Sequence, residues 1–87
     1  MEIKEVKIEN ETGIHARPAS ILVDVAHKFE SEIKLISQNK EANLKSIISI
    51  MSLAIGAGET VKIKAEGADE KEAVAKIIDT IKNKLRG

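Results

Sequence analysis

A histidine and an arginine stand two residues apart, at a point where a loop leads into a predicted helix. The segment Gly13-Ile14-His15-Ala16-Arg17-Pro18 places a glycine-containing loop directly before His15. A neutral imidazole is a nucleophile that is well populated near pH 7, and a guanidinium offers a planar pair of donors to phosphoryl oxygens. These residue types at this spacing indicate a histidine that accepts and holds a phosphoryl group.

The start of the predicted helix is a second source of anion binding. Pro18 fits the first turn, where a missing N–H costs nothing. The other N–H groups of a first turn have no partner inside the helix, and the helix dipole favours an anion there. The same dipole disfavours the imidazolium form of His15 and keeps the ring ready to attack. From the spacing alone, the simpler interpretation of a loop histidine beside a solvated Arg17 stays open.

Apolar residues at strand and helix spacings predict the elements that hold this segment in place. Along residues 2–9, Val6 and Ile8 share one face of a strand, and the out-of-phase Ile3 indicates an edge or a bend. Gln38-Asn39 fits a two-residue turn, because Asn tolerates positive φ. In chain order, the predicted elements are a strand over 2–9, a helix from Ala16, strands at 33–35 and 42–44, a short helix over 47–53, a strand over 61–65 and a final helix after Asp69.

The first and last predicted helices each carry an apolar stripe for a core. Asp69 and Glu72 resemble a capping box at the start of the last helix, and Lys28 falls in the last turn of the first, where the dipole favours it. The stripe of the first helix consists of Leu22, Val25, Ala26 and Phe29. The stripe of the last helix consists of Val74, Ile77, Ile78, Ile81 and Leu85.

The order β-α-β-β-α-β-α, with hairpin-type strand pairs and helices on one face, favours an α+β open-faced sandwich. The 87 residues suffice for a single domain over 1–87. Many functions use this architecture, so the element order does not identify an activity.

The short helix after residue 46 carries a second group of residues with a possible function. Ser46 is a good N-cap for this helix. This short surface helix carries three large apolar side chains, those of Ile47, Ile48 and Met51. They fit a docking patch beside His15. Ser20, one turn beyond Arg17, either rims that patch or is an ordinary helix-surface residue.

Composition excludes several classes of function. Fourteen basic and fourteen acidic residues leave no net charge, which argues against nucleic-acid or anionic-membrane binding. Phe29 is the one aromatic residue, and there are no cysteines, so stacking on bases, disulfides and cysteine–zinc sites are excluded. We expect no metal site, because His27 reads as an exposed residue near a helix end without ligand partners. No cofactor, signal peptide or membrane span is expected, and the cytoplasm is the expected location.

Two blocks of the sequence resemble one known family. The segment GIHARPAS, residues 13–20, resembles the phosphorylation-site motif of HPr, the histidine-containing phosphocarrier of the bacterial phosphoenolpyruvate-dependent sugar phosphotransferase system. The segment NLKSIISIMSL, from Asn43 to Leu53, resembles the family's regulatory-serine region at the expected separation. The resemblance covers essentially the whole chain. It implies a four-stranded antiparallel sheet covered on one face by three helices.

The resemblance also implies a role for each residue of the first block. Enzyme I, charged from phosphoenolpyruvate, would pass its phosphoryl group to Nδ1 of His15. Arg17 and the helix start at Ala16, Arg17 and Pro18 would hold the phosphate, and the IIA domain of a sugar permease would receive it. Ser20, Ile47, Ile48 and Met51 would form the docking surface for these partners. The chain would then be a monomeric carrier, consumed and regenerated, rather than an enzyme.

The resemblance implies a second role for Ser46. In the Gram-positive branch of the family, the equivalent serine is phosphorylated by an ATP-dependent HPr kinase/phosphorylase and is then read by a catabolite-control transcription factor. This sequence departs from the common pattern at Ile48, Ser49 and Ala54, where Met, Gly and Gly are frequent. These departures put the preference of the kinase in doubt more than the fold.

Three other functions are compatible with the fold class. One is a regulatory HPr-like module that works only through Ser46 and a transcription factor, although such modules lack the active histidine. Another is a carrier of the nitrogen-related phosphotransfer branch. The third is a ligand-binding or RNA-binding open-faced sandwich, against which the single Phe29 and the zero net charge count.

Overall fold

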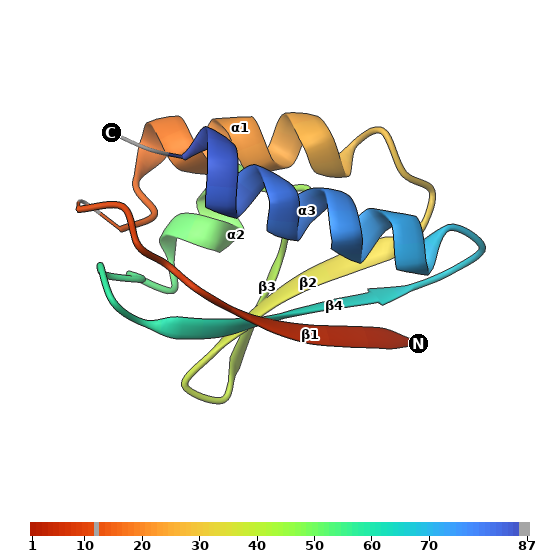
Figure 1. Cartoon of the computed structure of the whole chain (residues 1–87), viewed down its shortest axis with the longest axis horizontal. Helices are drawn as coiled ribbons and strands as arrows, with labels where there is room; N and C mark the ends of the chain where they lie inside the picture. Colours follow the sequence, from red (N-terminus) through yellow and green to blue (C-terminus); the bar gives the residue numbers. More distant parts are fainter. Residues whose placement is uncertain (12, 86–87) are drawn as a thin grey trace.

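A computed structural model describes residues 1–11 and 13–85 of the chain (Figure 1). Its elements follow the predicted order. They are β1 (Glu2–Lys7), α1 (Ala16–Ala26), β2 (Glu32–Ser37), β3 (Lys40–Asn43), α2 (Ile47–Met51), β4 (Thr60–Glu66) and α3 (Glu70–Lys84). The glycine-containing loop predicted before His15 includes Thr12, which lies outside the described residues.

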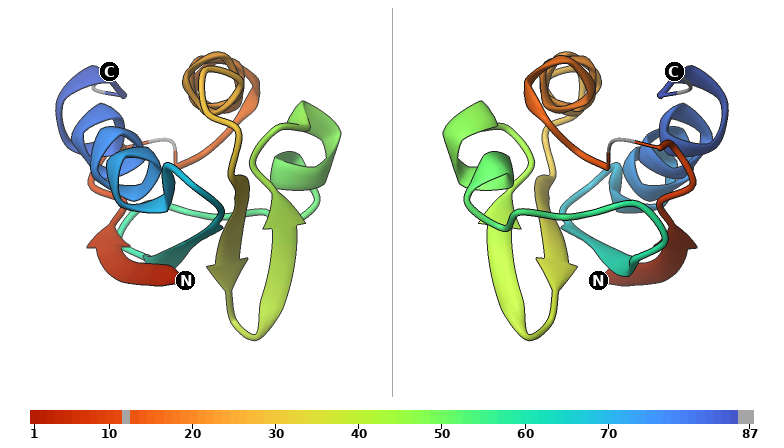
Figure 2. Two further views of the ribbon diagram at one scale, coloured as in Figure 1. Left: turned by 90° about the vertical axis from the view of Figure 1, so that its right-hand side faces the viewer. Right: turned by 90° about the vertical axis from the view of Figure 1, so that its left-hand side faces the viewer.

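The strands form one antiparallel sheet in the order β1-β4-β2-β3. Since alternate side chains of a strand point to opposite faces, Val61, Ile63 and Ala65 of β4 enter the core while Lys62 lies exposed on the other side. The end-on views in Figure 2 show the helices on one face of the sheet and the other face uncovered. This is the predicted α+β open-faced sandwich.

Strand β1 lies at one edge of the sheet, as the phase of Ile3 indicated. Ile3 is 48% exposed, whereas Val6 is buried and pairs with Val61 of β4. The strand ends at Lys7, two residues earlier than predicted. Ile8, the next residue, is buried, and its carbonyl accepts a hydrogen bond of 2.7 Å from the N–H of Gly58.

The connection between β2 and β3 is the predicted two-residue turn. Gln38 and Asn39 both have positive φ, 51° and 66°, as the tightest hairpin turns require. The predicted third strand extended to Leu44, but β3 ends at Asn43. Leu44 is buried, and its N–H still donates to the carbonyl of Ile33 at 2.9 Å.

The predicted stripe of α1 is only partly right. Leu22 and Ala26 are buried, but Val25 and Phe29 are half-buried, and the helix ends at Ala26, so Lys28 is not in its last turn. Packing against both α2 and α3 widens the buried face of α1 to Ala19 and Val23. On α3 the predicted stripe is buried except for half-buried Ile78, and Leu85 lies just beyond the helix.

The predicted capping box at the start of α3 is wrong. Asp69 occupies the N-cap position, but its carboxylate accepts hydrogen bonds from the N–H of Glu30 at 2.9 Å, the N–H of Ser31 at 3.0 Å and the hydroxyl of Ser31. These bonds, led by that of the Ser31 hydroxyl, hold the pKa of Asp69 below its usual range. The carboxylate therefore fastens the segment before β2 to the start of α3 instead of capping its own helix.

Candidate functional site

His15 occupies the N-cap position of α1, with its side chain free for external chemistry. Its backbone is extended, with φ −106° and ψ −162°, and its side chain makes no capping hydrogen bond to the described residues. The backbone carbonyl of His15 accepts a hydrogen bond from Ala19 at 2.9 Å and so starts the helix. The ring is exposed, and a ligand from solution can reach it.

A close backbone crossing fixes the loop that carries His15. The N–H of Ile14 donates to the carbonyl of Ile55 at 3.0 Å, and Gly13 has φ +69°. A Cβ atom on Gly13 would meet the Ile55 carbonyl oxygen and lie 2.8 Å from the Cα of Gly56. The side-chain amide of Asn10 also donates to the Gly13 carbonyl. Only glycine fits this crossing, because both the conformation and the space exclude a side chain.

The first turn of α1 leaves two N–H groups without partners inside the helix, those of Ala16 and Arg17. Pro18 has no N–H and cannot donate to a phosphoryl oxygen; it is buried, and its ring fixes φ in the first turn. The side chain of Arg17 is exposed. In the described part of the chain, no carboxylate lies within ion-pair distance of its guanidinium. Both the amides and the guanidinium are therefore available to an anion beside His15.

Helix α2 packs against α1 and presents an apolar surface. Ile48 is 83% exposed, Met51 44% and Ile47 37%, whereas Ile50 faces the core. We call Ile47, Ile48 and Met51 the α2 patch. The hydrogen bond between the N–H of Ile14 and the carbonyl of Ile55 brings the loop after α2 beside the start of α1. Ser20, on α1, is half-buried. The apolar surface and the free histidine thus belong to neighbouring elements.

Ser46 has the capping role that its position predicts. Its hydroxyl accepts a hydrogen bond of 3.2 Å from the N–H of Ser49, and its backbone is extended, with φ −132° and ψ 118°. The helix is shorter than predicted, since it ends at Met51 rather than at residue 53. Ala54 then has φ +51°, a conformation that favours glycine, and its N–H donates to the Met51 carbonyl at 3.1 Å.

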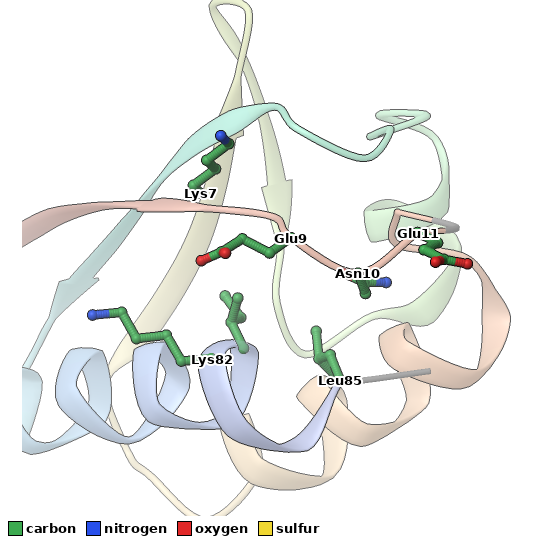
Figure 3. Close-up of a pocket in the computed structure, with 7 residues that line it drawn as sticks. Lys7, Glu9, Asn10, Glu11, Lys82 and Leu85 are labelled. Carbon is green, nitrogen blue, oxygen red and sulfur yellow. The ribbon is translucent and has the colours of Figure 1, made fainter.

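A separate cavity of about 450 Å³ opens between the end of β1 and the end of α3 (Figure 3). Two lysines and two glutamates line it, so it offers no excess charge to an ion. Its lining consists of Lys7, Glu9, Asn10, Glu11, Ile81, Lys82 and Leu85. Neither His15 nor Arg17 borders it, and we assign it no part in the chemistry of His15.

Within residues 1–11 and 13–85, no group of three His, Cys, Asp or Glu side chains is arranged to hold a metal ion. In the same part of the chain, none of the helices has the length and hydropathy needed to cross a bilayer.

The sequence did not predict the contact between His27 and Lys45. His27 is exposed near the end of α1, as predicted, and its Nε2 lies 3.2 Å from the carbonyl oxygen of Lys45, the residue before Ser46. The two residues are eighteen positions apart. No local pattern signals such a contact, because it depends on how α1 and the α2 segment pack.

Comparison with known proteins agrees with this arrangement of elements. The family model for the phosphorylation site of the phosphotransferase-system HPr component matches residues 3–83. An HPr structure from Thermoanaerobacter tengcongensis shares 46% identity and a TM-score of 0.93, over 98% of this chain and 96% of that chain. The phosphocarrier protein HPr of Bacillus anthracis shares 39% identity and a TM-score of 0.84, over 88% and 92%.

A regulatory relative is also similar. Crh, the catabolite repression protein of Bacillus subtilis, shares 36% identity and a TM-score of 0.78 over the full length of both chains, in a structure described as a domain-swapped dimer. The family model, matched over residues 3–83, and the structural neighbours place this chain in the HPr family of the phosphotransferase system.

Proposed function

We propose that this chain is a phosphocarrier that accepts a phosphoryl group on His15 from phosphorylated Enzyme I and passes it to the IIA domain of a sugar permease. The observation that carries the proposal is that the ring of His15, at the N-cap of α1, makes no capping hydrogen bond to the described residues. An N-cap side chain commonly bonds to its own helix. Here the imidazole is left exposed beside two open N–H groups and an exposed guanidinium.

The transfer step needs one nucleophile and several fixed donors. Nδ1 of His15 attacks the phosphorus, a nitrogen–phosphorus bond forms, and the bond between phosphorus and the donor breaks. The guanidinium of Arg17 and the N–H groups of Ala16 and Arg17 offset the charge on the phosphoryl oxygens. Phosphoryl transfer depends mainly on such positioning and charge stabilisation. The anchored crossing at Gly13 supports it by fixing the backbone that leads into His15.

The chain supplies half of each reaction site, and the partner supplies the other half. We propose that the α2 patch and Ser20 make the docking surface, because large apolar side chains exposed together are typical of protein interfaces. The chain is then a carrier rather than an enzyme, and it works in the cytoplasm as a monomer. Because an HPr from T. tengcongensis has been crystallised as a dimer, sedimentation of the carrier at working concentration tests the monomer.

Ser46 adds a regulatory function to this proposal. We infer that an HPr kinase/phosphorylase transfers phosphate from ATP to the Ser46 hydroxyl and that a catabolite-control transcription factor binds the product. Support comes from the position of Ser46 directly beside Ile47 of the α2 patch. A phosphate there adds roughly two negative charges to the proposed docking surface.

A purely regulatory role is the second candidate, because Crh is among the similar proteins. Such a module works through Ser46 alone and has no use for the free imidazole of His15. A nitrogen-branch carrier would use His15 but not a sugar IIA domain. The two carrier functions differ in the acceptor.

Onward transfer distinguishes these functions. The chain is phosphorylated with phosphoenolpyruvate and Enzyme I, freed of both, and mixed with the IIA domain of a sugar permease. We expect the phosphoryl group to leave the chain and appear on IIA. No uptake from Enzyme I supports the regulatory module, and uptake without transfer to a sugar IIA supports the nitrogen branch.

A further inference from the structure

His27 connects the end of α1 to the turn that carries Ser46. It is the C-cap residue of α1, and its Nε2 lies 3.2 Å from the carbonyl oxygen of Lys45. A carbonyl oxygen can only accept a hydrogen bond, so the proton of the ring must be on Nε2 for this contact to form. The contact therefore defines the ring orientation and requires a proton on Nε2.

Lys45 makes a second hydrogen bond, from its side chain, to the segment just after α1. Its ammonium group donates to the carbonyl of Phe29 at 2.8 Å. A cation is favourable near the carbonyl end of a helix. Two hydrogen bonds in opposite directions thus join residues 27–29 to Lys45, which is half-buried.

The peptide unit between Lys45 and Ser46 is held at both of its polar groups. The ring of His27 donates to its carbonyl, and its N–H, which belongs to Ser46, donates to the carbonyl of Asn43 at 3.0 Å. Because a peptide unit is planar, these two bonds fix its orientation. The Ser46 hydroxyl is fixed in turn by the N–H of Ser49 at 3.2 Å. The Ser46 carbonyl also accepts a hydrogen bond of 3.1 Å from the N–H of Ile50. Removing His27 releases the bond that holds the peptide carbonyl before Ser46.

We propose that His27 is a positioning residue for phosphorylation of Ser46, and this inference rests on the regulatory function proposed above. In the reaction, an oxygen–phosphorus bond forms at Ser46 Oγ and the bond from the γ-phosphorus of ATP to the β–γ bridging oxygen breaks. ADP leaves, and the hydroxyl proton passes to a base of the kinase. A kinase that receives Ser46 in a fixed orientation does not have to order the turn itself, which lowers the barrier to transfer.

The test compares two substitutions of the same residue. His27→Ala removes the donor, whereas His27→Gln keeps an N–H donor in nearly the position of Nε2. Lys28→Ala is the matched control, because Lys28 is the next residue, is exposed, and has no side-chain hydrogen bond to the described residues. Each protein is incubated with ATP and purified HPr kinase, and the initial rate of Ser46 phosphorylation is measured by intact mass. Uptake at His15 from Enzyme I serves as the check on folding.

We expect His27→Ala to be phosphorylated at Ser46 about fivefold more slowly, the effect of one lost hydrogen bond. His27→Gln recovers most of the rate, and Lys28→Ala equals the parent. All three take up phosphate at His15 at the parental rate. In the parent, imidazole ¹⁵N shifts place the His27 proton on Nε2.

Three results would contradict separate parts of this proposal. Equal Ser46 rates for the parent and His27→Ala reject His27 as a positioning residue while leaving the regulatory function intact. A parent that the kinase does not phosphorylate at Ser46 rejects the regulatory function and, with it, this role of His27. A neutral His27 ring with its proton on Nδ1 alone rejects the hydrogen bond itself.

Discussion

The Cα atom of Gly56 lies 2.8 Å from the place that a Cβ atom on Gly13 would occupy. The hydrogen bond from the N–H of Ile14 to the carbonyl of Ile55 holds the loop before His15 this close to the loop after α2. We expect Gly13→Ala to lower the free energy of unfolding by about 2–4 kcal/mol, from the left-handed conformation and the backbone clash together. Gly58→Ala is the control, because Gly58 has φ +85° but open space around its Cβ position. It loses only about 1–2 kcal/mol. Equal losses in urea unfolding would show that the crossing is not tight.

Arg17 gives a second prediction. Arg17→Lys keeps the positive charge but loses the planar pair of donors that matches phosphoryl oxygens. We expect uptake from Enzyme I to slow by about tenfold, with unchanged circular dichroism, because the side chain is exposed. Rates of phosphoryl uptake measured at several Enzyme I concentrations distinguish slower transfer from weaker docking. A rate equal to that of the parent would remove Arg17 from the site.

The cap at Ser46 permits a test of the regulatory charge. Aspartate caps helices as well as serine does, so Ser46→Asp keeps the fold while placing a negative charge beside Ile47. We expect it to accept phosphate at His15 more slowly at low salt and to lose most of that defect as salt rises. Ser46→Ala stays active at His15 but loses about 1 kcal/mol of stability with the cap. Equal rates for Ser46→Asp and the parent at low salt would contradict the electrostatic switch.

Local patterns in the sequence predicted the elements but not their long-range contacts. Alternation at Val61, Ile63 and Ala65 defines β4 because one face of the strand is buried, and the Gly-containing loop before Ala16 marks the start of α1. The strand order β1-β4-β2-β3, in contrast, depends on tertiary packing that no short window records.

Hydrogen bonds that side chains make to distant segments could not be predicted for the same reason. Asp69 has the sequence position of a cap, yet its carboxylate is taken by donors at Glu30 and Ser31, thirty-eight or more residues away. His27 has the appearance of a surface residue, yet it bonds to Lys45. A local capping rule fails where a tertiary partner offers more hydrogen bonds than the residue's own helix.

The bonds to Asp69 make stability depend on pH. They lower its pKa in the folded protein, so the carboxylate contributes stability above the unfolded-state pKa near 4 and loses it as pH falls through the lower folded-state value. We expect Asp69→Asn to be less stable than the parent at pH 6, and the gap to shrink as the pH falls below about 4. Glu72→Gln, on the same turn of α3, is the control. A parent–variant gap that stays constant from pH 6 to pH 2 would contradict this assignment.

The central claim is that the exposed imidazole of His15 carries the phosphoryl group, and one measurement tests it directly. The parent and His15→Ala are incubated with phosphoenolpyruvate and Enzyme I, and their intact masses are measured before and after acid treatment. We expect one phosphoryl group on the parent, lost in acid and stable in base, as for a phosphoimidazole. His15→Ala, folded by circular dichroism, carries none. An acid-labile phosphoryl group on His15→Ala, or none on the parent, would contradict the account.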